Sequence, residues 1–127
     1  YMLTLTAVLA ASLWIPYIIG VNSTPVPQPS DHRPHDPAGL VPWVHRAWRA
    51  HLNMLEQFLP FATLVLIAHL ANVSNVATVW ASIAFFALRV AHAVWMIRGF
   101  PTLPVRPILF SAGWVSIVVF AAAVLTA

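Results

Sequence analysis

Four long apolar segments, separated by three more polar connections, dominate the pattern of this 127-residue chain. The first covers residues 2–21 and carries no charge. Roughly 20 apolar residues suffice for a helix to cross the hydrocarbon core of a bilayer. We interpret this segment as a membrane span rather than a removed signal sequence, because it lacks a basic n-region and a small-residue cleavage site. Pro16 is expected to kink its last turn.

The second apolar segment predicts an unusually long helix over residues 43–71. Pro42 precedes it, at a position where a missing N–H costs nothing. At about 1.5 Å per residue such a helix exceeds the bilayer core, so its first turns are expected to protrude into the headgroup region. Pro60, inside the segment, removes one backbone hydrogen bond and is expected to bend the helix.

The connection between the first two segments, residues 22–42, is expected to be an irregular loop. Its density of proline excludes the interior of a helix or strand. His32 and His35 are three residues apart, a spacing that a metal pair can use. Without helical backbone or further ligands nearby, we expect a solvated loop and no metal site. The prolines concerned are Pro25, Pro27, Pro29, Pro34, Pro37 and Pro42.

The third segment, residues 76–97, is interrupted only by Arg89 and His92, and the fourth, residues 108–125, has no charge. Residues 71–75 form a short uncharged turn, and residues 98–107 form the last loop. The pattern predicts an all-α membrane protein, a four-transmembrane-helix bundle in one domain covering residues 1–127.

Composition supports this assignment and excludes several functions. The chain is 61% hydrophobic and 7% charged, against about 25% charged in soluble domains. Its cationic residues are all arginine, and the high pI near 10.7 follows from having three acidic residues. No nucleic-acid-binding motif is present, and no nucleic-acid partner is expected. Without cysteine, the chain has no disulfides, thiolate metal sites or cysteine nucleophile.

Arginines cluster at one end of the predicted bundle, on the loops between segments 1 and 2 and between segments 3 and 4. The turn between segments 2 and 3 has none. By the positive-inside rule these two loops are predicted to be cytoplasmic, with both termini on the opposite side.

The second segment contains a stripe of polar residues at helical spacing: Arg46, Arg49, Asn53 and Glu56. Glu56 is the only carboxylate in a predicted span, where a charge is costly unless it is paired or faces water. Arg89 is expected to lie at a similar depth, and we predict that it forms a buried ion pair with Glu56.

The surplus of cations at this depth has two interpretations. It indicates either a positive cavity for an anionic ligand or arginines that extend to lipid phosphates. For Arg46 and Arg98 we favour lipid headgroups. For Arg49 and Arg106 we favour the ligand, mainly because of the family resemblance described next.

The run from Arg49 to Glu56, followed by Pro60 and Phe61, resembles the RAHxNxxE…PF signature of the MAPEG family, the membrane-associated proteins of eicosanoid and glutathione metabolism. Two later stretches, from Arg89 to His92 and from Pro104 to Arg106, resemble that family's RxxH helix and its following arginine. The four-span layout fits along essentially the whole chain. The short length and proline-rich first loop look most like the small bacterial members.

This resemblance implies a homotrimer in a bacterial inner membrane, with glutathione as co-substrate bound between subunits near the cytoplasmic face and no metal. Arg106 would be the catalytic residue, stabilising the glutathione thiolate by lowering the pKa of the thiol. That thiolate would attack an apolar electrophile or reduce a lipid hydroperoxide. The residues implied to bind glutathione are Arg49, His51, Asn53, Glu56, Arg89 and His92.

The chain departs from the family pattern at three positions, of which the missing tyrosine favours a second function. Met96 stands where the family usually has a tyrosine, and Pro107 stands where some members have serine. The arginine that ends the first helix in eicosanoid-type members is also missing; Asn22 is the nearest polar residue. The second hypothesis is a non-enzymatic subunit that binds membrane lipids or belongs to a larger membrane complex. Such a protein would keep the four-helix fold but would not catalyse the glutathione reaction.

Overall fold

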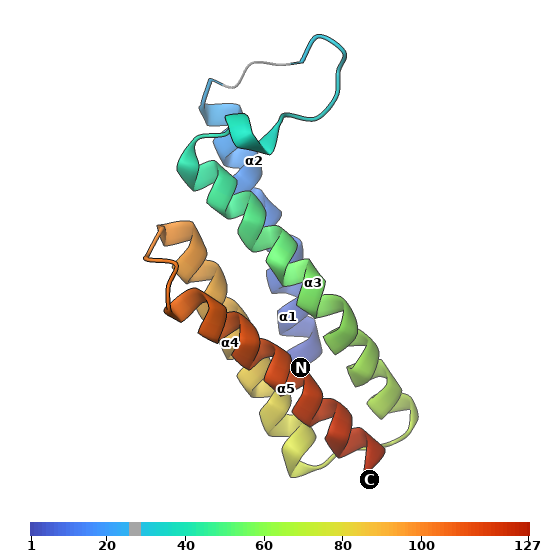
Figure 1. The fold of residues 1–127 in the computed structure, drawn as a ribbon. Coiled ribbons are helices and arrows are strands. Elements are labelled where there is room, and N and C mark those ends of the chain that lie inside the picture. The colour runs from blue at the N-terminus through green and yellow to red at the C-terminus, as the bar shows by residue number, and fades with distance from the viewer. Residues whose placement is uncertain (26–28) are drawn as a thin grey trace.

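The computed structural model describes residues 1–25 and 29–127, and the part of the chain it describes is helical with no strand (Figure 1). Its elements are α1 (Met2–Ser12), α2 (Trp14–Ser23), the 3₁₀ turn η1 (Pro37–Gly39), α3 (Pro42–Leu70), α4 (Val76–Arg98) and α5 (Val105–Leu125). Pro27, one of the prolines in the predicted loop, lies outside the described residues.

The predicted four-span architecture is confirmed. Among the described residues, four helical stretches are long and apolar enough to cross a membrane: Met2–Ser23, Pro42–Leu70, Val76–Arg98 and Val105–Leu125. The first consists of α1 and α2, which meet at Leu13. The interruption lies three residues before Pro16, because proline has no N–H to donate to the Ser12 carbonyl and its ring crowds that turn. The predicted kink therefore falls in the middle of the span rather than in its last turn.

The boundaries of the later helices follow local chemistry. Pro42 is the first residue of α3, which continues through Pro60 without interruption to Leu70. Asn75 begins α4 with a capping box, since its side chain accepts from the Thr78 N–H and the Thr78 hydroxyl accepts from the Asn75 N–H. Gly99 ends α4 in the left-handed conformation, with φ 77°.

Two details differ from the sequence prediction. The first loop, expected to be irregular, contains the turn η1, whose first residue is Pro37 and which is capped by the Asp36 carboxylate. The last helix begins at Val105, three residues before the predicted start, so Arg106 lies in the first turn of α5. A proline at the third helical position is compatible with this start, because the first N–H groups of a helix have no partner within it.

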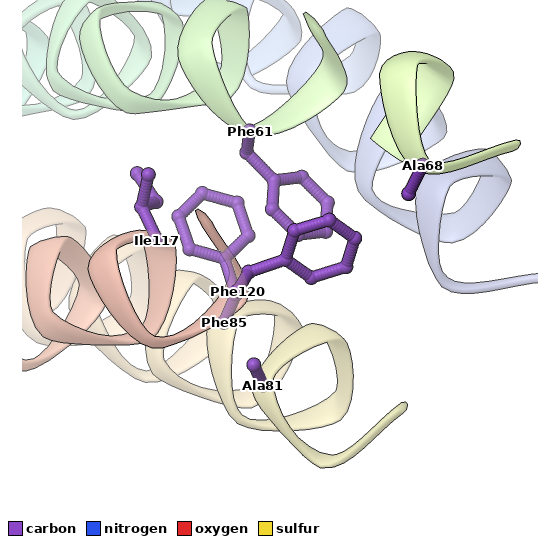
Figure 2. Close-up of a cluster of buried hydrophobic side chains, with 6 residues drawn as sticks. All are labelled: Phe61, Ala68, Ala81, Phe85, Ile117 and Phe120. Carbon is purple, nitrogen blue, oxygen red and sulfur yellow. The ribbon is translucent and has the colours of Figure 1, made fainter. Parts of the chain in front are cut away.

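An aromatic cluster joins α3, α4 and α5 (Figure 2). The Phe61 ring stacks on Phe85, with ring centroids 4.2 Å apart, and meets Phe120 edge-on at 6.1 Å. Ile117 and small side chains from α3 and α4 complete the cluster. Lipid tails are as apolar as these side chains, so the hydrophobic effect does not drive helix association in a bilayer. Close packing of this kind holds the helices together instead.

Candidate functional site

A cavity of about 340 Å³ lies toward the loop end of α3, α4 and α5. Its wall combines two ionisable side chains, His92 and Arg106, with polar and apolar neighbours. The size falls within the range of small-molecule sites, which are mostly apolar with a few convergent polar groups. The lining residues are Asn53, His92, Thr102, Leu103, Arg106, Pro107, Phe110 and Ser111.

Three of the predicted site residues, Asn53, His92 and Arg106, line this cavity. His92 is 1% exposed, and its Nε2 atom has no hydrogen-bond partner. Arg106 is half-buried at the start of α5. A cation and a spare imidazole nitrogen in a partly enclosed space are suited to an anionic or hydrogen-bonding ligand.

The predicted ion pair between Arg89 and Glu56 is wrong. Arg89 is buried on the inner side of α4, and its Nη1 donates to Gln57 Oε1 at 2.5 Å. Glu56 is exposed on the outside of this protomer. Across residues 1–25 and 29–127 the structure has one ion pair, between Arg33 and Asp31 in the first loop.

Helical geometry explains why Gln57, and not the preceding Glu56, contacts Arg89. The buried face of α3 includes Ala50, Met54, Gln57 and Phe61, which recur at the spacing of one side of a helix. Glu56 is one residue away from that series, and one residue rotates a side chain by about 100° around a helix. The polar stripe therefore begins at the edge of the inward face and ends outside it.

Gln57 is the site residue that sequence analysis missed. Its Oε1 accepts from Arg89, and its Nε2 donates to the Phe110 carbonyl at 2.9 Å, so one amide joins α3, α4 and α5. Space for it depends on Gly113, where a Cβ would lie 2.6 Å from Gln57 Oε1. The sequence signal that could have identified Gln57 is its spacing from Met54 and Phe61, which places it on the buried face of α3.

The predicted site residues Arg49, His51 and Asn53 of α3 differ in their partners. Asn53 is 5% exposed, and its Nδ2 donates to the Met96 sulfur at 3.3 Å. Arg49, half-buried, donates to Asn53 Oδ1 at 3.5 Å and lies 5.7 Å from the Trp48 ring centroid. His51 is half-buried with an unpartnered Nδ1. The structure thus brings Arg49 and Asn53 together.

Two contacts hold the loop that borders the cavity. The Trp95 indole N–H donates to the Pro101 carbonyl at 2.9 Å, just before Thr102 and Leu103 in the cavity wall. Arg46 lies against Gly99, where a Cβ would be 2.7 Å from the guanidinium carbon. Arg46 therefore packs between helix ends, and its contact with a lipid headgroup stays a prediction.

Metal ligands do not gather in this region. Within the described ranges, no three His, Asp or Glu side chains come close enough to hold a metal ion. His32 and His35 lie in the first loop, where His32 has the left-handed φ of 60°.

Comparison with known proteins gives one result that covers nearly the whole chain. A search of curated proteins finds no match. The model of the MAPEG family matches residues 1–126, in agreement with the four apolar helices and with the signature that runs from Arg49 to Phe61. This all-helical membrane protein therefore belongs to the MAPEG family.

Proposed function

We propose that this protein is a glutathione-dependent membrane transferase or peroxidase. Family membership supports a glutathione-related membrane protein in general. The observation that carries the more specific proposal is the cavity itself, in which the Arg106 side chain and the unpartnered Nε2 of His92 share one wall. A thiol tripeptide with two carboxylates is a ligand that such a cation-rich recess suits.

Arg106 would stabilise the thiolate form of glutathione, since a neighbouring cation favours the charged state of a thiol. In the transferase reaction, the thiolate sulfur forms a bond to an electrophilic carbon and the leaving group departs. In the peroxidase reaction, the sulfur attacks the outer peroxide oxygen, the O–O bond breaks, and the alkoxide takes a proton to become an alcohol. A second glutathione then converts the sulfenic acid to a disulfide and water.

The apolar part of the cavity supports a second substrate that arrives from the membrane. Leu103, Pro107 and Phe110 line it beside the polar groups. Pro107 and Leu103 are exposed on the protomer surface. A lipid-soluble electrophile or hydroperoxide would thus meet the thiolate at the boundary between apolar and polar wall.

A homotrimer is part of the proposal, because the protomer alone leaves Glu56 exposed at membrane depth. A carboxylate facing lipid is costly, and a neighbouring subunit would supply cover and polar partners. In such an assembly glutathione would bind between subunits, with Glu56 accepting from its free amine and with Arg49, His51 and Asn53 as further contacts. Arg89 and His92 would complete the pocket.

The proposed setting is a bacterial inner membrane, with the loop between α2 and α3 and the loop between α4 and α5 on the cytoplasmic side. The asymmetric placement of arginine supports this orientation. Glutathione would then enter from the cytoplasm, close to Arg106 in the first turn of α5.

Glutathione titration of the purified protein in lipid nanodiscs tests the proposal. Binding by the wild type and its loss in Arg49→Ala and Glu56→Ala are expected. Arg98→Ala is the matched control, since Arg98 is exposed at the same end of the bundle and outside the cavity. A wild-type protein that binds no thiol and shows no thiol-dependent turnover would contradict the proposal.

A second candidate, a non-enzymatic subunit of a membrane complex, is favoured by Met96. This side chain is buried, and its sulfur accepts a hydrogen bond from the Asn53 amide. Unlike the tyrosine that is usual at this position in the family, methionine has no hydroxyl group. Purification from native membranes distinguishes the two functions. Recovery as single copies within a larger complex would support the accessory function, and a free homotrimer would support the enzyme.

A further inference from the structure

The innermost cation of the bundle has a neutral partner. Arg89 is 1% exposed, and its hydrogen bond is to the side-chain amide of Gln57, itself 5% exposed. No carboxylate in the part of the chain that the structure describes forms an ion pair with Arg89. The amide therefore accepts from one N–H group and adds no negative charge of its own, so the carboxylate that acts on Arg89 is that of Glu56, through space and without an ion pair.

The neutral partner is notable because a carboxylate, Glu56, is present one residue away. Glu56 precedes Gln57 on α3 and is turned outward. A carboxylate at position 57 would form a buried ion pair with Arg89, whereas the amide accepts the hydrogen bond and adds no second negative charge beside it.

The charge lies directly behind the cavity wall. The guanidinium carbon of Arg89 is 5.5 Å from the ring centroid of Phe110, which lines the cavity. His92, one turn further along α4, lines it as well. With Arg106 in the same wall, two positive charges act on the cavity, and fields within a region of low dielectric are screened little.

We propose that Gln57 is a positioning residue that fixes Arg89 behind Phe110 and, being neutral, leaves its charge to act on the ligand, so that the cavity selects anionic ligands. The inference rests on the proposed function and adds a determinant of specificity to it. Gln57 holds this position through its second bond, to the Phe110 carbonyl, and through the space left by Gly113.

The first test uses the ligand-free protein and compares Gln57→Glu with Gln57→Leu. Both variants lose the bond to the Phe110 carbonyl, because neither side chain has an N–H group. They differ in that the carboxylate offers Arg89 a hydrogen-bond acceptor and a negative charge, whereas leucine offers neither. A higher Tm for Gln57→Glu than for Gln57→Leu is expected, and equal or reversed values would overturn the inference.

The second test measures the affinity of the same variants for glutathione and for its diethyl ester, in which both carboxylates are neutralised. Gln57→Glu should weaken glutathione binding at least about tenfold while changing ester binding less than about twofold. A purely structural role would weaken both ligands alike, and that outcome would overturn the inference. A wild type without affinity for glutathione would end the proposed function and with it the selection of anionic ligands, while the ligand-free comparison would still decide whether Gln57 positions Arg89.

Discussion

Two neighbouring layers of the bundle are built on opposite principles. In one, Phe61, Phe85 and Phe120 pack ring against ring without a polar atom (Figure 2). In the other, one turn away on both α3 and α4, Gln57 and Arg89 form a buried hydrogen bond. The apolar layer leaves nothing unsatisfied. The polar layer leaves nitrogen atoms without a partner, including Arg89 Nε and His92 Nε2, so the layer that stabilises the fold and the layer proposed to recognise a ligand are separated by a single helical turn.

The largest effect on stability should follow from breaking the apolar layer. Phe61→Ala removes a fully buried ring that contacts two others, at a cost of about 3–5 kcal/mol. The free energy of unfolding in detergent, measured by thermal or chemical denaturation, checks this value. Phe100→Ala is the control, because Phe100 is 49% exposed. Equal losses in both variants would contradict the assignment of Phe61 to the core.

A smaller effect is expected at the boundary of the polar layer. In Gly113→Ala the new methyl group would meet Gln57 Oε1 at 2.6 Å, and overpacking of this kind costs about 1–3 kcal/mol. Because Gln57 must move, glutathione affinity should fall as well. Gly39→Ala is the matched control, since a Cβ at Gly39 meets nothing within 4 Å. Unchanged stability in Gly113→Ala would show that Gln57 does not occupy this position.

The loop that borders the cavity gives the next prediction. Trp95→Phe removes the indole N–H that donates to the Pro101 carbonyl, a hydrogen bond that contributes about 1 kcal/mol. Glutathione affinity should decrease by a few fold, because Thr102 and Leu103 would be held less firmly. Trp114→Phe, at an exposed position on α5, serves as control. A loss of affinity that is the same in both variants would argue against a role for this contact.

The smallest effect is expected at Met96. Met96→Leu replaces a thioether by a hydrocarbon of similar volume, a change that usually costs less than about 1.5 kcal/mol. Asn53 loses a weak sulfur acceptor and keeps its contact with Arg49. Thermal unfolding and glutathione titration should both stay close to wild type. A large loss of turnover with unchanged stability would instead assign chemistry to the sulfur.

The apolar features of the structure could be predicted from sequence, because hydropathy over about 20 residues determines which segments cross a membrane. The four spans and the family resemblance are confirmed. The starting residue Pro42 and the end at Gly99 follow from local chemistry that proline and glycine dictate.

The polar contacts inside the bundle could be predicted only in part. Sequence identifies Arg89 as a cation that needs a partner, but a rotation of one residue decides whether Glu56 or Gln57 faces it. That rotation depends on how Phe61 and Met54 pack, which spacing alone does not determine. A prediction based on charge selects Glu56 as the partner of Arg89, because the neighbouring Gln57 is neutral.

The ultraviolet absorbance of glutathione bound at neutral pH tests the central claim most directly, since thiolate and thiol absorb differently. A thiolate band is expected when the wild type is titrated at a pH where free glutathione is mostly protonated. The band should vanish in Arg106→Ala and persist in Arg98→Ala. A wild type without the band, or a band that survives Arg106→Ala unchanged, would contradict the claim that the cations of this cavity activate a thiol.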